Sequence, residues 1–282
     1  MNILETRKDL QTLLKRWKDR DDLSVAFVPT MGNLHAGHLR LVEEAHQRAD
    51  RVLVSIFVNP LQFGAGEDFA SYPRTLDEDR RALEDAGAHA LFLPSVQTLY
   101  PRPMEEMTRI RVPGISEMLC GASRPGHFEG VATVVCKLFN LTRPDVAVFG
   151  EKDYQQLAII RRMVADLDMP VSIVGVPTVR EPDGLAMSSR NGYLTAEERR
   201  RAAVLQQVLQ TVSAGLREGG EMQALLSDAH GQLIEAGFRP DYLQVRRRSD
   251  LAEAVAEDRE LVILAAAYLG RARLIDNLSV DR

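Results

Sequence analysis

Short apolar runs alternate with segments of helical periodicity between residues 24 and 176. The runs are rich in branched side chains, as expected of parallel strands covered on both faces, and they lie at residues 24–28, 52–58, 90–93, 146–149 and 171–176. The helical segments lie at residues 10–17, 39–49, 77–86, 131–139 and 157–167. Strands that alternate with helices predict an α/β fold with a doubly wound parallel sheet and right-handed crossovers.

The pattern changes after residue 177. A loop rich in Gly, Ser and Pro is followed by two long charged helical segments, at residues 197–217 and 221–236. Strand-like segments then follow without alternation, at residues 242–245, 261–267 and 273–277. This order predicts a smaller α+β domain. We place the domain boundary between residues 177 and 190, which gives domains at 1–177 and 178–282.

Composition and charge narrow the class of protein. The 282 residues are 45% hydrophobic and 27% charged, as in ordinary globular proteins of about two domains. Lys and Arg number 35 against 40 Asp and Glu, so the net charge of -5 disfavours nucleic acids and anionic membranes as partners. The short basic run Arg246-Arg247-Arg248 is interpreted as a solvated strand end rather than a binding patch.

Several features predict a cytoplasmic protein. Cys120 and Cys136 have no metal-binding spacing and suit a reducing compartment as free thiols. The first residues are charged too early for a signal peptide, and the longest apolar run, at residues 261–269, cannot span a bilayer.

The most informative segment is Pro29-Thr30-Met31-Gly32-Asn33-Leu34-His35-Ala36-Gly37-His38, which lies where a predicted strand turns into its helix. Open α/β sheets bind ligands at such turns. Backbone N–H groups that we expect to be unpaired, and the positive end of the helix dipole, favour a phosphate group there. Gly32 and Gly37 allow close approach, and His35 and His38 share one helical face, from which imidazoles can donate hydrogen bonds to phosphoryl oxygens.

Three other segments carry polar groups in similar positions. Gly150-Glu151-Lys152-Asp153-Tyr154-Gln155-Gln156 also follows a strand, and its Lys152 suits phosphate, Asp153 a ribose hydroxyl or Mg²⁺-bound water, and Gln156 a small polar substrate. Met187-Ser188-Ser189-Arg190-Asn191 offers hydroxyls and a guanidinium on a loop that we expect to be mobile; a surface linker is the alternative. Gln62, in a loop after the strand at residues 52–58, could bind a hydroxy acid or serve as a turn amide.

Residues 35–38 resemble the HxGH signature of the adenylyl-transferring superfamily, which includes class I aminoacyl-tRNA synthetases and nucleotidylyltransferases. Residues 187–191 look like a counterpart of the mobile KMSKS loop of the same superfamily, with Arg190 where a Lys would usually act. The four segments, with Tyr72-Pro73-Arg74-Thr75, Arg124-Pro125-Gly126-His127-Phe128 and Arg273-Leu274-Ile275-Asp276-Asn277, closely resemble the pantoate-beta-alanine ligase family over about residues 20 to 277.

This resemblance implies an ATP-dependent, AMP-forming ligase of pantothenate biosynthesis that condenses (R)-pantoate with β-alanine through a pantoyl adenylate and releases AMP and pyrophosphate. It also implies a Rossmann-like ATP- and pantoate-binding domain at 1–177, a smaller α+β domain at 178–282 that closes over the site, Mg²⁺, and a homodimer.

The resemblance carries over site residues position by position. The implied ATP site is Met31, Gly32, Asn33, Leu34, His35, Ala36, Gly37, His38, Gly150, Glu151, Lys152, Asp153, Val179, Met187, Ser188, Ser189 and Arg190. The implied catalytic residues among them are His38, which matches the position of the proton donor, and His35, Lys152, Ser188, Ser189 and Arg190. Gln62 matches a residue shared by pantoate and β-alanine, and Gln156 matches a second pantoate contact.

Alternatives stay open at this point. A nucleotidylyltransferase acting on a phosphorylated acceptor would share the HxGH segment, although Gln62 and Gln156 are uncharged where a phosphate would favour a cation. A non-catalytic nucleotide-binding module would bind ATP without releasing pyrophosphate. The carboxylate that holds the metal is not identified: Asp79, in an acidic stretch, is a candidate, but a solvated helix face is the preferred interpretation.

Overall fold

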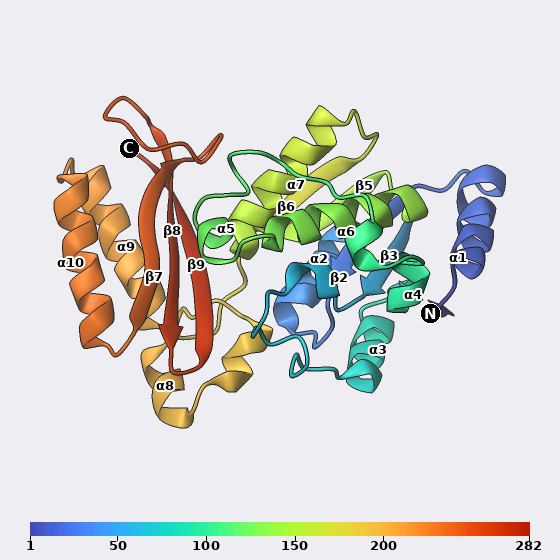
Figure 1. The fold of residues 1–282 in the computed structure, drawn as a ribbon, viewed down its shortest axis with the longest axis horizontal. Helices are drawn as coiled ribbons and strands as arrows, with labels where there is room; N and C mark the ends of the chain where they lie inside the picture. Colours follow the sequence, from blue (N-terminus) through green and yellow to red (C-terminus); the bar gives the residue numbers. More distant parts are fainter. The chain divides into compact units, whose positions relative to one another are not determined.

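The computed structural model describes all residues from 1 to 282, and the chain forms two compact units (Figure 1). The first unit comprises Met1–Glu151 and Gln156–Pro177, and the second comprises Lys152–Gln155 and Thr178–Arg282. No helix in the structure is both long enough and apolar enough to cross a membrane.

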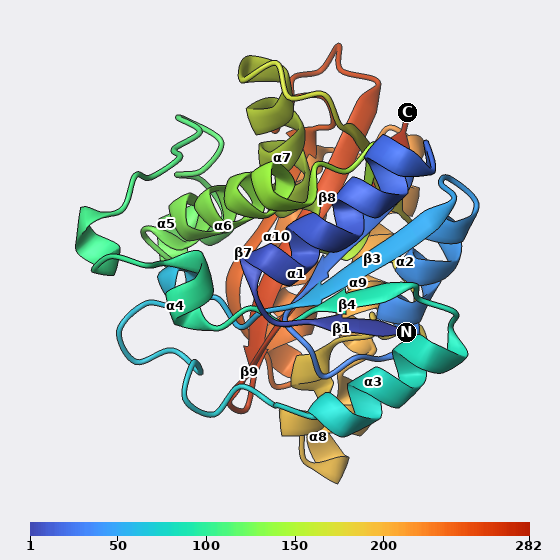
Figure 2. The ribbon, with the colours of Figure 1, turned by 90° about the vertical axis from the view of Figure 1, so that its right-hand side faces the viewer.

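The first unit is built on a parallel sheet of six strands in the order β1-β4-β3-β2-β5-β6. Figure 2 shows β1, β4 and β3 side by side. The strands are β1 (Asn2–Leu4), β2 (Val25–Thr30), β3 (Arg51–Ile56), β4 (Ala90–Phe92), β5 (Val146–Gly150) and β6 (Ser172–Val176). The expected doubly wound parallel sheet is therefore confirmed.

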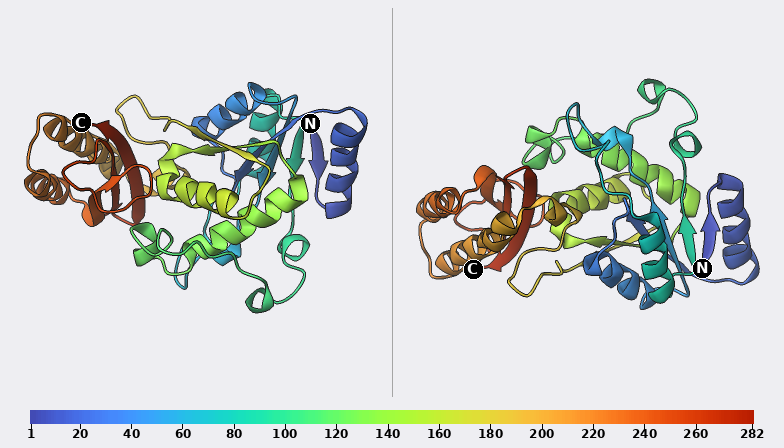
Figure 3. Two further views of the ribbon diagram at one scale, coloured as in Figure 1. Left: turned by 90° about the horizontal axis from the view of Figure 1, so that it is seen from above. Right: turned by 90° about the horizontal axis from the view of Figure 1, so that it is seen from below.

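Helices cover both faces of this sheet, as the views in Figure 3 show. The helices between β1 and β6 are α1 (Arg7–Leu14), which continues into the π-helical turn η1 (Lys15–Arg20), α2 (Ala36–His46), α3 (Leu76–Asp85), α4 (Val96–Leu99), α5 (Cys120–Ser123), α6 (His127–Thr142) and α7 (Tyr154–Asp166). Alternate residues of a strand point to opposite faces. Accordingly, Ala26 and Val28 of β2 pack with α2 and α3, whereas Phe27 lies edge-on to Phe139 of α6.

One strand of the sheet was not predicted. The edge strand β1 pairs with β4 over only three residues, Asn2–Leu4. A run this short shows no periodicity, so only the tertiary pairing with β4 identifies it.

The second unit is an antiparallel sheet with helices packed against it. Its strands, in the order β7-β8-β9, are β7 (Arg239–Arg247), β8 (Glu260–Leu269) and β9 (Ala272–Asp281), all longer than predicted. α9 (Val204–Arg217) and α10 (Met222–Glu235) bury apolar side chains against this sheet in one hydrophobic cluster. The smaller α+β domain is thus observed.

The helix predicted at residues 197–217 is wrong as a single element. The structure divides it into α8 (Ala196–Arg201) and α9 (Val204–Arg217). At the junction, the N–H of Leu205 donates to the carbonyl of Ala202 and that of Gln206 to Ala203, which is the tighter spacing of a 3-10 turn. Both alanines are buried, and alanine has a high helix propensity, so no residue at the junction marks this break in the sequence.

The three arginines at residues 246–248 all contact polar or acidic side chains of the second unit. Arg248 pairs with Glu260 and Asp281, and Arg247 pairs with Asp250 at 2.9 Å. Arg246 donates hydrogen bonds to the Gln244 side chain of the same strand. These pairs favour a strand end over a binding patch, but the expected solvation is wrong for two of the three side chains, because Arg246 is 15% exposed and Arg248 26%.

Candidate active site

The central strands of the first unit end together at one edge of the sheet. In the registered pairs of β2 and β3, Thr30 lies opposite Ile56, and β5 on the other side of β2 ends at Gly150. The chain runs from β2 to β3 and from β5 to β6, which lie on opposite sides of the β2–β5 pair. The edge at which β2 and β5 end is therefore the topological switch point, where open α/β sheets bind ligands. Apart from Gly150 itself and its two neighbours in the chain, no heavy atom lies within 4 Å of the position that a Cβ at Gly150 would take.

His35 and His38 lie at the beginning of α2, directly after β2. His35 is the N-cap residue, and its Nδ1 accepts the N–H of Gly37 at 3.1 Å, while Nδ1 of His38 accepts the N–H of His35 at 3.3 Å. The ring centroids are 4.1 Å apart. Backbone N–H groups can only donate, so each neutral ring carries its proton on Nε2. Both imidazoles can therefore donate from Nε2 to an anionic oxygen.

The expectation of unpaired N–H groups before α2 is wrong for two positions. The N–H groups of Asn33 and Leu34 donate to the carboxylate of Asp79, at 2.9 and 2.7 Å. Asp79 is only 3% exposed, so the preferred interpretation of a solvated helix face is also wrong. Because the carboxylate already accepts these hydrogen bonds, a phosphate has to find its donors further along, at the histidines and the first turn of α2.

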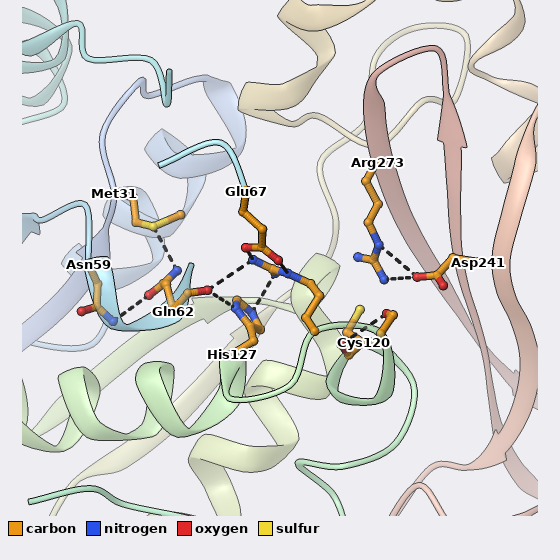
Figure 4. A network of polar contacts seen from close by, with 10 residues as sticks. Met31, Asn59, Gln62, Glu67, Cys120, His127, Asp241 and Arg273 are labelled. Carbon is orange, nitrogen blue, oxygen red and sulfur yellow. Dashed lines mark hydrogen bonds and ion pairs between the residues drawn. The ribbon is translucent and has the colours of Figure 1, made fainter. Parts of the chain in front are cut away.

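Gln62 is held in one orientation by a chain of buried polar groups (Figure 4). It ends the 3-10 turn η2 (Pro60–Gln62), and its Oε1 accepts from Nδ2 of Asn59 at 3.1 Å. Asn59 Nδ2 also donates to the carbonyl of Gly130, and Asn59 Oδ1 accepts from the hydroxyl of Tyr100 at 2.8 Å. Since the Gly130 carbonyl can only accept, the Asn59 amide has one orientation, and Gln62 directs its Nε2 donor toward Met31 Sδ at 3.0 Å.

Tyr100 keeps its proton over the whole working pH range. Burial raises the pKa of its phenol above the ordinary value, against a smaller opposing effect of Arg109. The hydroxyl therefore remains a donor to Asn59. Sequence reasoning missed both residues; the only local signal was the Asn59-Pro60 dipeptide, which is typical of turn initiation.

A second set of contacts holds the backbone of Gln62 (Figure 4). Its carbonyl accepts from Arg124 at 3.3 Å and lies 2.7 Å from Nδ1 of His127. Arg124 pairs through two nitrogens with Glu67, at 2.7 and 2.5 Å. Partial burial acts to raise the pKa of the Glu67 carboxyl, but the hydrogen bonds and charge of Arg124 outweigh it and keep that pKa below its ordinary value.

Gln156 belongs to the first unit and lies in the first turn of α7. Glu151 begins the 3-10 turn η4 (Glu151–Asp153), and one of its carboxylate oxygens lies 3.0 Å from the position of a Cβ on Gly175.

The other predicted ATP residues belong to the second unit. Lys152 lies 3.8 Å from the carboxylate of Asp153, and its carbonyl accepts from Nδ2 of Asn277 at 3.0 Å. Half of the Asp153 side chain is exposed, at 49%.

The segment around Ser188 follows a short antiparallel bridge between Arg180 and Ala186 within the second unit. The N–H of Met187 donates to the carbonyl of Val179 at 3.0 Å, and Ser188 caps the 3-10 turn η5 (Ser189–Tyr193) by accepting from the N–H of Arg190. Arg180 pairs through both terminal nitrogens with Asp276, whose side chain is 2% exposed, at 2.7 and 2.9 Å. In the same unit, Arg273 pairs with Asp241 at 2.6 Å (Figure 4).

The structure brings together part of the predicted site. In the first unit, Met31 and Gln62 are in direct contact, the histidine pair lies at the beginning of the helix that follows β2, and Gly150 ends the neighbouring strand β5. No group of three or more His, Cys, Asp or Glu side chains is arranged to hold a metal ion, and neither Cys120 nor Cys136 forms a disulfide.

Comparisons with known proteins give one consistent family. The profile of a family described as Pantoate-beta-alanine ligase matches residues 2–279. The chain is 58% identical over 269 residues to a pantothenate synthetase of Shewanella sediminis, covering 95% of each chain, and 57% identical over 274 residues to that of Shewanella sp. (strain ANA-3), covering 97% of each.

Solved structures agree with the sequence comparisons. A pantothenate synthetase of Thermus thermophilus superposes with a TM-score of 0.93 at 46% identity, covering 100% of both chains. A pantoate-beta-alanine ligase of Francisella tularensis, complexed with beta-gamma ATP and beta-alanine, gives a TM-score of 0.83 at 34% identity, covering 99% of this chain and 97% of that one.

Proposed function

The chain belongs to the pantoate-beta-alanine ligase family, and from this premise we propose that it condenses (R)-pantoate with β-alanine at the expense of ATP, through a pantoyl adenylate. The pantoate carboxylate attacks the α-phosphorus of ATP and pyrophosphate leaves. The amine of β-alanine then attacks the activated acyl carbon, the amide forms, and AMP leaves.

The observation that carries the proposal is the position of His35 and His38 at the beginning of α2, at the topological switch point. Their Nε2–H groups are fixed as donors by the backbone contacts of Nδ1. Such donors stabilise charge on the phosphoryl oxygens in the transition state and on the leaving pyrophosphate. His38 is proposed as the proton donor.

Gln62 and Gln156 are proposed as the substrate amides. Gln62 Oε1 already accepts a hydrogen bond from the Asn59 amide, so Gln62 is proposed to bind substrate through its Nε2 donor. Donors suit the carboxylate and hydroxyl oxygens of pantoate and the carboxylate of β-alanine. A neutral amide also binds pantoate without the cation that a phosphorylated acceptor would favour, which argues against a nucleotidylyltransferase.

The remaining predicted ATP residues are proposed to act as two groups. Met31 to His38, Gly150 and Glu151 belong to the first unit, which is the proposed binding domain for ATP and pantoate. Lys152, Asp153, Val179 and Met187 to Arg190 belong to the second unit, and closure of this domain is proposed to exclude water from the adenylate.

Mg²⁺ is proposed as the metal that accompanies ATP, where it would offset charge on the phosphates. The residues fit an ion held mainly by the nucleotide, because Mg²⁺ commonly takes one or two carboxylates, substrate phosphates and water. The half-exposed Asp153 is a suitable carboxylate, whereas both oxygens of Asp79 already accept backbone N–H groups. A homodimer is proposed on the resemblance, and a cytoplasmic location is proposed on the resemblance and on the absence of a disulfide between the two cysteines.

The proposed activity is tested by pyrophosphate release from Mg-ATP, first with pantoate alone and then with pantoate and β-alanine. Mass spectrometry follows AMP and the amide. We expect pantoate-dependent release, with AMP and pantothenate accumulating only when β-alanine is added. Protein that is folded and binds ATP but shows no pantoate-dependent release would contradict the proposal, and phosphorylated acceptors would then be tried.

Replacement of Gln62 should separate acid binding from ATP binding. In Gln62→Ala we expect the KM values for pantoate and β-alanine to rise about 10-fold to 100-fold, the scale of a lost hydrogen bond to a charged group. ATP affinity, measured by calorimetry, should change little. The control is Gln223→Ala, which removes an exposed glutamine of α10. A selective loss of ATP affinity in Gln62→Ala would contradict the assignment.

A further inference from the structure

Asp79 is a buried carboxylate surrounded by neutral donors. It lies in the first turn of α3, where the neighbouring acids Asp77 and Glu78 are exposed. Besides the N–H groups of Asn33 and Leu34, it accepts the hydroxyl of Thr75 at 3.1 Å. Burying a carboxylate is costly, and three hydrogen bonds to the charged form are the kind of compensation that permits it.

The backbone that Asp79 contacts is in an unusual conformation. Gly32 has φ +85° and Asn33 has φ +51°, so two successive residues lie in the left-handed region, which glycine adopts readily and asparagine tolerates better than most other residues. A Cβ at Gly32 would lie 3.1 Å from Asp79 Oδ2 and 3.0 Å from Ile56 Cγ2. An anion that accepts hydrogen bonds from two successive backbone N–H groups stabilises such a conformation.

This conformation sets where α2 begins. Leu34 is followed directly by His35, the N-cap residue whose Nδ1 accepts the N–H of Gly37. His38 then lies one helical turn later and accepts the N–H of His35. A change in the backbone at residues 33–34 would therefore move both imidazoles together.

We infer that Asp79 is a positioning residue for adenylation: its carboxylate holds residues 33–34 so that His35 and His38 direct their Nε2–H groups at the ATP phosphates. This inference rests on the proposed function. It assigns Asp79 a role through the backbone, in place of metal binding, and explains why an acidic residue lies beside a site for anionic phosphates: its charge is directed at N–H groups of the protein.

Asp79→Asn is the direct test, because an amide group can accept one of the two N–H groups but opposes the other with its own NH₂. We expect kcat for pantoate-dependent pyrophosphate release to fall about 10-fold to 100-fold, the scale of a small misplacement of catalytic groups. The Mg²⁺ concentration that gives half-maximal rate should stay the same. Asp77→Asn removes the same charge from an exposed position of the same turn and should behave as wild type.

Nitrogen-15 NMR of the histidine side chains in unliganded protein supplies a readout that depends on imidazole placement. In Asp79→Asn, the Nδ1 signals of His35 and His38 should move toward the average of the two tautomers. His89 serves as an internal reference, because its Nδ1 accepts the N–H of Val52 at 3.0 Å in a different part of the first unit. Its signal should not move.

The outcomes decide between the roles. Recovery of wild-type kcat in Asp79→Asn at high Mg²⁺ would identify a metal ligand and overturn the inference, as would unchanged kcat and histidine signals. If Asp79→Asn does not fold, Thr75→Val, which removes one of the three donors, takes its place, and wild-type behaviour in both readouts then overturns the inference. If wild-type protein shows no pantoate-dependent release, the proposed function fails, while the NMR spectra still decide the role of Asp79.

Discussion

Replacing His38 by Ala should slow the formation of pantoyl adenylate by about 10²-fold to 10⁴-fold, the range for one acid-base group or one preorganised donor to the transition state. The reason is geometric. The capping contact at Nδ1 leaves Nε2–H as a fixed donor next to His35, whose ring centroid is 4.1 Å away. ATP affinity should fall less than the rate, because a donor that acts mainly on developing charge contributes to the transition state. Single-turnover measurement of pyrophosphate release with pantoate gives the rate directly.

Two variants separate catalysis by His38 from its structural role as a cap. His38→Asn can still accept the N–H of His35 through its side-chain oxygen, but it has no group where Nε2 stood. We expect this variant to keep the stability of wild type and to be as slow as His38→Ala. His46→Ala removes an exposed imidazole from the other end of α2 and should leave the rate unchanged. Near-normal adenylate formation in His38→Ala would remove His38 from the mechanism.

The alternation of strands and helices could be predicted because it depends on local patterning. Buried parallel strands such as β2 and β3 appear as continuous apolar runs, and α2 and α6 carry apolar stripes at helical spacing. Elements without such a pattern could not be found. The edge strand β1 depends on pairing with β4, and the break between α8 and α9 falls at two alanines, which themselves favour a helix.

The candidate site could be predicted only as far as its chemistry is carried by contiguous residues. His35 and His38 are three residues apart, so their shared face follows from helix geometry alone. The partners that fix these groups are distant in sequence. Asp79 contacts residues 33 and 34 across more than forty positions, at separations of 46 and 45 residues, and the phenol of Tyr100 reaches Asn59 across 41.

Contacts between residues distant in sequence also explain why Asp79 was wrongly interpreted as part of a solvated helix face. Three consecutive acids at the beginning of a helix are most often solvated and favoured by the helix dipole. One of the three faces the interior of the unit because α3 packs beside α2, and that packing brings backbone N–H groups to it. The order of charged residues in the sequence does not show which of several neighbouring acidic side chains accepts hydrogen bonds from buried backbone N–H groups.

The contact between α6 and the Gln62 turn leads to a second large expected effect. A Cβ on Gly130 would lie 2.2 Å from the carbonyl oxygen of Leu61 and 2.7 Å from the backbone nitrogen of Gln62. These are backbone atoms, so they cannot move away by changing a rotamer. In Gly130→Ala we expect the free energy of unfolding to fall by about 3 kcal/mol, the upper part of the usual range for overpacking. The KM for pantoate should rise together with this loss, because η2 has to shift and Gln62 moves with it.

Gly231→Ala is the matched control, since it makes the same substitution inside a helix, α10, where nothing lies within 4 Å of the new Cβ. Helix propensity alone favours Ala over Gly by about 1 kcal/mol, so this control should gain stability and keep the wild-type KM. Urea unfolding and steady-state kinetics measure the two quantities. If Gly130→Ala matched Gly231→Ala in both, close backbone packing of α6 on η2 would be unnecessary for placing Gln62. A rise in KM confined to Gly130→Ala would instead connect the affinity for pantoate to a helix that carries none of the predicted site residues.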